Sequence, residues 1–507
     1  MASPAQLPAR PRWTGSPALL LSAGAALVVM SQLRWGIGAL AWLAPVPLLR
    51  YLRITRGWRA RTLLAVVLLG AWIAAALKIT TAPLPLAFAL PVGGGLGVAA
   101  AAVYLGWDLL RRRAPAWAAT LAFPAWAAVV EWLQPRATPL ATWGAAAYTQ
   151  VENLPLLQLA SVLGMAGVGF LVHWVAAWLE SALSSALDGG PAPWRHGIAV
   201  GAALSAAVTF GSLRLAEPLP ADSVRVAAIG TTATFTGFPV PSRAERDRIV
   251  DTLLADTRRA AEGGARIAVW TEASAVVEPG AEEDALVARG LETARRLGIE
   301  IVMAYIVPRS VQPPSFENKY AWASPAGLRQ AYEKHHPAPG EPAIVGTGPL
   351  SAVEVPWGRA GGALCYDYDH PALAREHARL GVGLVALPSS DWRGIDPIHT
   401  QMAAVRAIEG GFSLLRSTRS GLSGAIDARG RFRAWQSSFD PGDRVVLADL
   451  PAVAVPTAYA AAGDVLVWIA MAGLAALALR AVLHRSTRAV PSPGAAGVAS
   501  SAPEAAR

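Results

Sequence analysis

The sequence predicts a multi-spanning α-helical membrane domain, with about eight transmembrane helices in the chain, joined to an α/β domain. Two observations support this fold class. Of the 507 residues, 53% are hydrophobic and only 16% are charged, whereas soluble domains average about 25% charged residues. Apolar residues dominate 17–215 and 465–483, while residues 220–450 carry most of the acidic side chains. The chain therefore divides into a membrane region, a more polar domain and a closing span.

We place the membrane domain at residues 1–216, the α/β domain at 220–455, the closing helix at 463–484 and a disordered tail at 491–507. Each candidate span approaches the roughly 20 residues that cross about 30 Å of hydrocarbon. The alternative, that these runs are buried helices of a large soluble protein, is disfavoured because so many long apolar runs recur with only short polar segments between them. The eight candidates lie near 17–33, 36–52, 62–80, 85–110, 115–133, 155–180, 196–215 and 463–483.

Arginine clusters predict the orientation of the helices, because short cytoplasmic loops retain Lys and Arg. If the spans alternate, all the main clusters fall on one side of the membrane. We therefore expect both termini in the cytoplasm and the α/β domain on the outer side. The same clustering leaves the net charge of +9 without one basic face, which argues against nucleic acid as a partner. The clustered arginines are Arg10, Arg12, Arg50, Arg53, Arg56, Arg59, Arg61, Arg111, Arg112, Arg113, Arg485 and Arg488.

From Val224 onward, short apolar runs alternate with amphipathic helices, which indicates an α/β domain with buried strands. Catalytic groups in such domains tend to lie just past strand ends. Glu272 follows one predicted strand, Cys365 closes another, and Lys334 lies in the segment Tyr-Glu-Lys-His-His-Pro. The predicted strands are 224–229, 265–270, 299–307, 362–365, 382–387 and 412–417, and the predicted helices are 242–262, 281–297, 372–380 and 400–409.

Glu272, Lys334 and Cys365 together supply what a cysteine nucleophile needs. A base takes the thiol proton, and a cation stabilises the thiolate and a developing oxyanion. Taken singly, each residue has a simpler explanation. Cys365, the only cysteine, is then a buried apolar residue, Glu272 a helix cap and Lys334 a solvated charge. Only the occurrence of all three together favours catalysis.

Two other chemistries are weaker. Ser423 in Gly-Leu-Ser-Gly-Ala lacks the final glycine of a Gly-x-Ser-x-Gly nucleophile elbow. The histidines and aspartates show no paired spacing of the His-Glu-x-x-His kind, so we expect no metal. The residues considered for a metal site are His335, His336, His370, Asp367 and Asp369.

Several segments resemble the carbon-nitrogen hydrolase (nitrilase) family, whose triad occurs in the order Glu, Lys, Cys. In the α/β domain these segments are Trp-Thr-Glu at 270–272, Tyr-Glu-Lys-His-His at 332–336, Leu-Cys-Tyr-Asp at 364–367, Gln-Met-Ala-Ala-Val-Arg-Ala-Ile-Glu at 401–409 and Leu-Leu-Arg-Ser-Thr at 414–418. The membrane half resembles the bacterial membrane branch of that family, the apolipoprotein N-acyltransferases. There the matching residues are Glu131-Trp132, Trp143-Gly144, Tyr148, Leu-Pro-Leu-Leu-Gln-Leu-Ala at 154–160, Gly164 and Gly167.

The resemblance extends over nearly all of the chain between the first and last spans. It implies a nitrilase-like α-β-β-α sandwich and an acyl transfer in two steps. Cys365 attacks an ester carbonyl of a phospholipid, with Glu272 as general base and Lys334 stabilising the oxyanion. The α-amine of a lipoprotein's diacylglyceryl-cysteine then attacks the thioester. The implied partners are a phospholipid donor, a diacylated apolipoprotein acceptor and the bilayer of the bacterial inner membrane, with no cofactor and a monomeric enzyme.

Three further residues stand at positions that support the site in this family: Glu341, Tyr366 and Asp367. Glu341 is alternatively an exposed loop carboxylate, and Tyr366 alternatively a packing residue. The chain departs from the family at Asp367, which replaces a glutamate, and between Lys334 and Glu341, where it is one residue shorter. We therefore expect the loops that gate substrate entry to differ.

Two alternative functions stay open. The same fold and triad would serve a membrane-bound amidase or nitrilase in which water resolves the thioester. A catalytically inactive sensor or scaffold would use neither. Within the membrane half, Glu131 lies deep in an apolar run and is expected to face the interior of the bundle or to lie near its outer edge.

Overall fold

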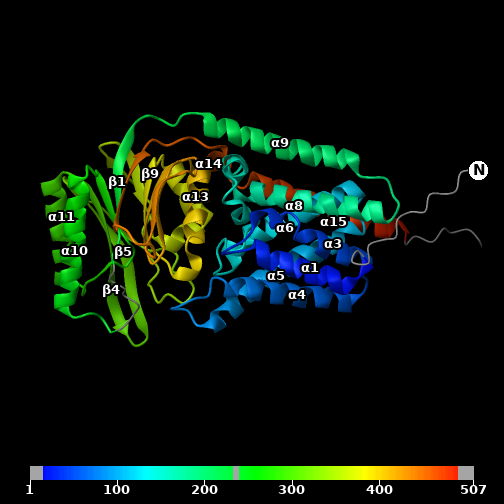
Figure 1. The fold of residues 1–507 in the computed structure, drawn as a ribbon, viewed down its shortest axis with the longest axis horizontal. Helices are drawn as coiled ribbons and strands as arrows, with labels where there is room; N and C mark the ends of the chain where they lie inside the picture. The colour runs from blue at the N-terminus through cyan, green and yellow to red at the C-terminus, as the bar shows by residue number, and fades with distance from the viewer. Residues whose placement is uncertain (1–14, 232–238, 489–507) are drawn as a thin grey trace, which may run out of the picture.

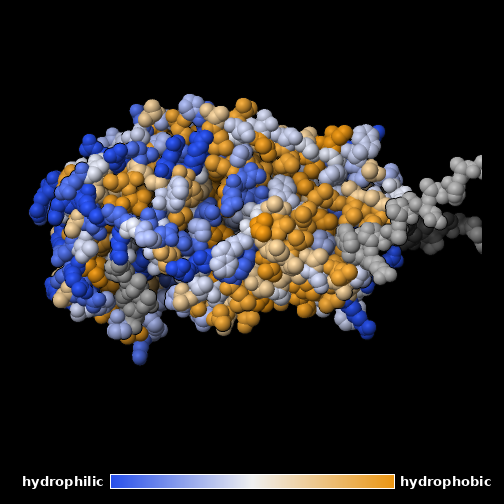
Figure 2. All heavy atoms as spheres, viewed as in Figure 1, coloured by the Kyte–Doolittle hydropathy of each residue, from blue (hydrophilic) through white to orange (hydrophobic). Residues whose placement is uncertain are grey.

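The computed structural model describes residues 15–231 and 239–488, so the tail predicted at 491–507 lies outside the described residues. The chain forms a bundle of helices and a layered α/β domain that packs on one end of the bundle (Figure 1). The last helix returns from the α/β domain to the bundle. Hydrophobic side chains cover most of the visible surface of the bundle, and hydrophilic ones concentrate on the α/β domain (Figure 2).

Within the described residues, five helices are long and apolar enough to cross a membrane, when the short turn η2 (Leu86–Phe88) is counted with α5. The first predicted span is a helix of only 15 residues, and the second is broken between Gly38–Ala41 and Pro45–Ile54. The predicted count of eight is therefore not confirmed. The bundle helices are α1 (Pro17–Ser31), α2 (Gly38–Ala41), α3 (Pro45–Ile54), α4 (Trp58–Leu77), α5 (Ala89–Arg111), α6 (Ala116–Ala137), α7 (Leu154–Leu157), α8 (Ala160–Leu187), α9 (Trp194–Ala216) and α15 (Val465–Arg488).

Ion pairs hold the bundle at its arginine-rich end. The buried Asp108 of α5 accepts hydrogen bonds from Arg61 at 2.8 Å and from Arg111 at 2.9 Å. Arg53 binds Glu180 of α8 through two hydrogen bonds of 2.6 and 2.7 Å. A carboxylate in an apolar bundle needs such partners, because an unpaired buried charge costs several kcal/mol or more. These pairs therefore fix α3 to α8 and α4 to α5.

The α/β domain consists of two stacked sheets between two layers of helices, which confirms the predicted sandwich. One sheet has the order β13-β1-β2-β4-β5-β6, with β3 beside β4, and the other has the order β12-β11-β10-β9-β8-β7. Helices α10 and α11 cover the first sheet, and α12 and α13 lie on the second sheet, toward the bundle (Figure 1). The helices are α10 (Arg243–Glu262), α11 (Ala281–Leu297), α12 (Pro371–Arg379) and α13 (Ile398–Gly410).

The predicted strands 224–229, 265–270, 299–307, 382–387 and 412–417 are confirmed within a few residues. The prediction for 362–365 is wrong, because β8 ends at Gly362 and Cys365 begins the 3-10 turn η4 (Cys365–Asp369) with a positive φ of 43°. The strands are β1 (Ser223–Ile229), β2 (Ile267–Trp270), β3 (Ala275–Val276), β4 (Glu300–Val311), β5 (Pro314–Ser324), β6 (Gly327–Glu333), β7 (Ala352–Val355), β8 (Gly358–Gly362), β9 (Leu384–Ser390), β10 (Ser413–Arg419), β11 (Leu422–Ile426), β12 (Phe432–Ser437) and β13 (Val445–Pro451).

At a break in helix α8, the bundle contacts the α/β domain. Gly164 has φ 66° and ψ −177°, a backbone conformation that essentially only glycine adopts. The break leaves the N–H of Met165 without a helical acceptor, and this N–H donates to Glu409 of α13 at 2.6 Å. Arg406 forms an ion pair with the same carboxylate at 2.7 Å. The conformation of Gly164 therefore supports one of the contacts between the two parts.

We predict that Gly164→Ala lowers the free energy of unfolding by about 1–3 kcal/mol, because the backbone is strained for any other residue. The added Cβ would also lie 2.5 Å from the Tyr459 ring. Gly201→Ala in α9 is the matched control, since nothing lies within 4 Å of its added Cβ. Thermal unfolding in detergent measures both, and equal melting temperatures would contradict the proposed role of Gly164.

Candidate active site

The Lys334 ammonium is buried between two carboxylates. Its Nζ lies 2.7 Å from Glu272 Oε1 and 2.7 Å from Glu341 Oε2. Asn318 on β5 donates from one amide nitrogen to both carboxylates, at 2.8 Å each. Lys334 is 2% exposed and Glu272 is 3% exposed. The structure therefore brings together two residues of the predicted triad and the predicted supporting Glu341.

The ends of two strands of the first sheet deliver Glu272 and Lys334, and the loop after β6 delivers Glu341. Glu272 follows β2, and Lys334 follows β6, where its N–H donates to the Asn318 carbonyl at 2.9 Å. Glu341 also accepts from the N–H of Ala338 at 2.8 Å, so its carboxylate closes the shortened loop onto Lys334. Glu341 is thus not the free loop carboxylate of the alternative interpretation.

Asp367 ties the turn that carries Cys365 to the loop that carries Lys334. Its Oδ2 accepts from the N–H of Leu364 at 3.0 Å and from the Tyr332 hydroxyl at 2.8 Å. Its Oδ1 accepts from the N–H groups of His335 and His336 at 3.1 and 2.7 Å. The aspartate that stands in place of the family's glutamate therefore has a structural explanation of its own.

The Cys365 thiol is buried, at 5% exposed, and donates weakly to the Ser390 carbonyl at 3.6 Å. Burial and the nearby Glu272 carboxylate raise the pKa of Cys365 well above its usual value, against the opposing effect of Lys334. Burial also disfavours the ammonium of Lys334, but Glu272 and Glu341 outweigh burial and raise the pKa of Lys334. At neutral pH the site therefore holds a neutral thiol beside a cation.

The membrane bundle contacts the same turn. The Tyr366 hydroxyl donates to the Pro139 carbonyl at 2.7 Å, which explains Tyr366 as more than a packing residue. From the same loop between α6 and η3 (Ala146–Gln150), Thr142 Oγ1 donates to the Asp369 carbonyl at 2.8 Å, and Trp143 Nε1 donates to Asp369 Oδ2 at 2.8 Å. The turn that bears Cys365 thus lies between the two parts of the protein and is bound by both.

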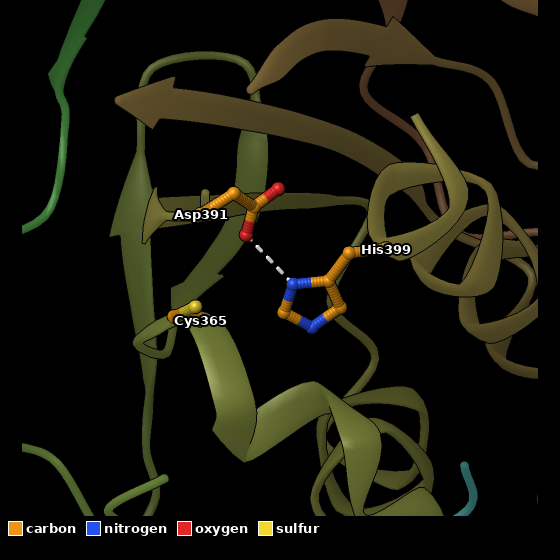
Figure 3. Close-up of side chains that lie close together, drawn as sticks. All are labelled: Cys365, Asp391 and His399. Carbon is orange, nitrogen blue, oxygen red and sulfur yellow. Dashed lines mark hydrogen bonds and ion pairs between the residues drawn. The ribbon is translucent and has the colours of Figure 1, made fainter. Parts of the chain in front are cut away.

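A second buried network, which the sequence did not predict, lies beside the thiol (Figure 3). His399 contacts Asp391 through Nδ1 at 2.7 Å and Asp369 through Nε2 at 2.9 Å. Arg416 donates to both oxygens of Asp391 at 2.9 Å. Burial favours neutral imidazole, but Asp369 and Asp391 dominate and raise the pKa of His399 to about 9. His399 is therefore charged at neutral pH.

Cys365, Asp391 and His399 each place a potential ligand atom within 4.8 Å of the others, and these are residue types that bind zinc. However, both ring nitrogens of His399 and both oxygens of Asp391 already have partners. A metal ion would also face the Arg416 guanidinium. The geometry favours a network of ion pairs over a metal centre.

Sequence reasoning missed Asn318, Asp391 and His399 as parts of the site. Arg416 lies inside the matched segment Leu-Leu-Arg-Ser-Thr, and His399 stands two residues before another matched segment, at 401–409. The position of His399 and Arg416 in or beside these matched segments was the only hint that they belong to the site. No sequence spacing predicts that residues on β5, α13 and β10 lie close together.

The sandwich fused to an apolar bundle defines a membrane-bound protein of the nitrilase class. The model of the apolipoprotein N-acyltransferase N-terminal domain matches residues 24–178, and the carbon-nitrogen hydrolase model matches residues 225–458. Together with the relatives described next, these matches show that the chain belongs to the apolipoprotein N-acyltransferase family.

Among curated relatives, an apolipoprotein N-acyltransferase of Geobacter metallireducens is 25% identical over 376 residues, or 68% of this chain and 70% of the relative. One from Bradyrhizobium diazoefficiens is 29% identical over 399 residues, or 71% and 73% of the two chains. Among solved structures, an amidase from Nesterenkonia sp. is 21% identical, with a TM-score of 0.38, over 46% of this chain and 92% of the amidase.

We predict that Glu272→Gln separates thiol ionisation from catalysis. Because the Glu272 charge raises the pKa of Cys365, its removal should shift the pH profile of iodoacetamide alkylation to lower pH. Acyl transfer should nevertheless fall by about 10²–10⁴-fold, because Glu272 is the predicted general base. Alkylation reports on one site alone, since Cys365 is the only cysteine. Glu354→Gln, at an exposed residue of β7, is the control. An unmoved alkylation profile would contradict the electrostatic coupling.

We predict that His399→Gln removes a pH-dependent part of the stability. The pKa of His399 is raised from 6.5 to about 9, so the folded state holds the proton more tightly than the unfolded state. The charged imidazole therefore stabilises the fold fully below about pH 6.5, and this stabilisation is lost as the pH rises through about 9. Over that window the unchanged protein should lose on the order of 3 kcal/mol more unfolding free energy than His399→Gln. Thermal unfolding at several pH values measures this difference, with His196→Gln in α9 as the control. Parallel pH curves for all three proteins would contradict a charged His399.

Proposed function

We propose that this enzyme transfers an acyl chain from a phospholipid to the α-amine of the N-terminal diacylglyceryl-cysteine of lipoproteins, through a thioester on Cys365. The observation that carries the proposal is the contact between the turn of Cys365 and the membrane bundle. Tyr366 binds the Pro139 carbonyl, and Asp369 binds Thr142 and Trp143. A nucleophile held at the end of a membrane bundle is placed to receive an ester that stays anchored in the bilayer.

In the first step, Glu272 takes the Cys365 proton as the sulfur attacks the ester carbonyl of the phospholipid. The negative charge that develops on the carbonyl oxygen is stabilised by the Lys334 ammonium. When the tetrahedral intermediate collapses, the carbon–oxygen bond breaks. The lysophospholipid alkoxide takes the proton back from Glu272. Glu341 contributes by holding Lys334 in place from the other side.

In the second step, the amine of the lipoprotein attacks the thioester carbonyl and Glu272 accepts a proton from it. The carbon–sulfur bond breaks, an amide forms, and the Cys365 sulfur recovers a proton from Glu272. Aminolysis of a thioester is downhill, so neither a nucleotide nor a metal is needed. Water in place of the amine would turn the same site into a hydrolase.

We also propose that the enzyme works as a monomer in the bacterial inner membrane, with its α/β domain outward and its termini in the cytoplasm. The arginine-rich loops support this orientation. Arg61 stands in the first turn of α4, while the loop after α4 reaches the α/β domain, where Trp392 donates to the Ile79 carbonyl at 2.6 Å. The loop before α4 therefore lies at the opposite end of the bundle, where the positive-inside rule places the cytoplasm.

We predict that a phospholipid labelled in its acyl chain labels Cys365 covalently, and that neutral hydroxylamine removes the label. Cys365→Ala should give no label, and Lys334→Met should lower the rate by roughly 10²–10³-fold, because the oxyanion loses its stabilising charge. Intact mass spectrometry of the purified protein measures the adduct.

The acceptor is tested separately by mass spectrometry of lipoprotein N-termini in cells with and without the gene. Loss of the third acyl chain on deletion, and its return with the unchanged gene but not with Cys365→Ala, is the expected result. A thioester that forms but is released only to water would instead identify a hydrolase.

A further inference from the structure

A cavity of about 280 Å³ lies where the bundle meets the α/β domain, on the side of α6 and α15. Residues of α6, of the broken turn in α8, of the segment from His370 into α12, of the short helix α14 (Ala458–Ala462) and of the loop before α15 line it. Both parts of the protein thus contribute to its walls. The mechanism above assigns this cavity no role.

Two arginines line the cavity, and one of them has no anionic partner. Arg136 at the end of α6 forms an ion pair with Asp464 at 3.3 Å. Arg375 on α12 donates from Nε to the Ala460 carbonyl at 3.3 Å. Within residues 15–231 and 239–488, no carboxylate is ion-paired with Arg375. Its guanidinium is therefore available to an anion from outside the chain.

The acidic residues of the cavity are already engaged. Asp464 accepts from Trp132 Nε1 at 2.9 Å and from the Tyr459 hydroxyl at 3.1 Å, in addition to its ion pair with Arg136. Glu131, which faces the interior, accepts from the N–H of Ala146 at 3.0 Å. The acidic side chains are thus held by neighbours other than Arg375.

The cavity adjoins the candidate active site. His336 and His370 line it and stack with ring centroids 3.9 Å apart. The N–H of His336 binds Asp367, two residues after Cys365, and the His370 ring lies 5.8 Å from that of Tyr366. One wall of the cavity is therefore built from the segments that follow Lys334 and Cys365.

Tryptophans of α6 and α15 flank the cavity, and Trp132 is part of its lining. Trp132 of α6 and Trp468 of α15 pack edge to face at 5.3 Å, and Trp468 is 57% exposed. Exposed tryptophans of this kind mark the boundary between hydrocarbon and water in membrane proteins. An anion bound in the cavity is consequently more readily a lipid headgroup than a solute.

We propose that this cavity binds the phosphate group of the phospholipid donor, with Arg375 as the principal contact and Arg136 as a second one. The proposal rests on the proposed function. A guanidinium pairs with phosphate through two parallel hydrogen bonds, which suits it to a phosphodiester. The acceptor presents an amine and no phosphate at its lipidated end, so this chemistry selects the donor.

The test compares full-length proteins in a Cys365→Ala background, in which no acyl transfer consumes lipid. Arg375→Gln is compared with Arg379→Gln, because Arg379 lies one turn further along α12, is exposed and does not line the cavity. Native mass spectrometry measures retention of dioleoyl phosphatidylglycerol and of dioleoylglycerol, which has the same chains but no phosphate. Arg375→Gln should weaken phosphatidylglycerol retention about tenfold, as expected for the loss of a charged hydrogen bond, and leave dioleoylglycerol unchanged.

Equal retention of phosphatidylglycerol by Arg375→Gln and Arg379→Gln would overturn the proposal, as would a parallel loss of both lipids. Arg375→Lys and Arg136→Gln extend the test should Arg375→Gln fold poorly. Lysine should restore part of the retention because it keeps the charge, and Arg136→Gln should lower retention less than Arg375→Gln.

With Cys365 present, Arg375→Gln should raise the KM for phospholipid in thioester formation and change kcat little. An unchanged KM would overturn the assignment to the donor. If no protein forms a thioester, the proposed function fails, and the retention measurement still decides whether the cavity binds phosphate.

Discussion

The candidate site depends on keeping one ammonium group charged inside the protein. An isolated buried cation costs several kcal/mol, and it is tolerated only with good partners. Lys334 has two of them, Glu272 and Glu341, at 2.7 Å each, and Asn318 holds both carboxylates in place. This requirement explains why a glutamate far along the loop from Lys334 folds back onto it, and why the loop remains closed although it is one residue short.

The same principle of paired buried charge extends from the site to the membrane. His399 stands between Asp369 and Asp391, and Arg416 donates to both oxygens of Asp391. Asp369 also accepts from Trp143 of the bundle. Removing His399, for example, would take away the cation that pairs with Asp369, so these contacts depend on one another. The nucleophile is therefore positioned jointly by the α/β domain and the membrane bundle.

Sequence reasoning succeeded where local pattern decides structure. Alternating apolar runs located most of the buried strands, and the order Glu272, Lys334, Cys365 pointed to the site. Sequence reasoning failed where contacts between distant parts of the chain determine the local structure. The chain leaves the strand before Cys365 because Asp367 and the bundle loop at Pro139 hold the turn in place. The local sequence Gly-Gly-Ala-Leu-Cys does not predict this turn. Asn318 was missed because its partners come from distant segments: Glu272 follows β2, Lys334 follows β6, and Glu341 lies in the loop after β6. The predicted count of eight spans is not confirmed, because the second apolar run is interrupted just before Pro45 and the first apolar helix and the apolar part of the last one are short.

Charge balance also bears on how the site would react. A resting Cys365 thiolate would add a negative charge near Glu272 and Glu341, which share the Lys334 ammonium, and burial opposes that charge further. The proposed proton transfer from Cys365 to Glu272 avoids this cost, because it moves charge within the buried group and leaves the total unchanged. In the proposed mechanism the negative charge then passes to the substrate oxygen, where the Lys334 ammonium stabilises it. A deeply buried and protonated thiol is thus compatible with nucleophilic catalysis, provided that base and cation lie in the same enclosed group.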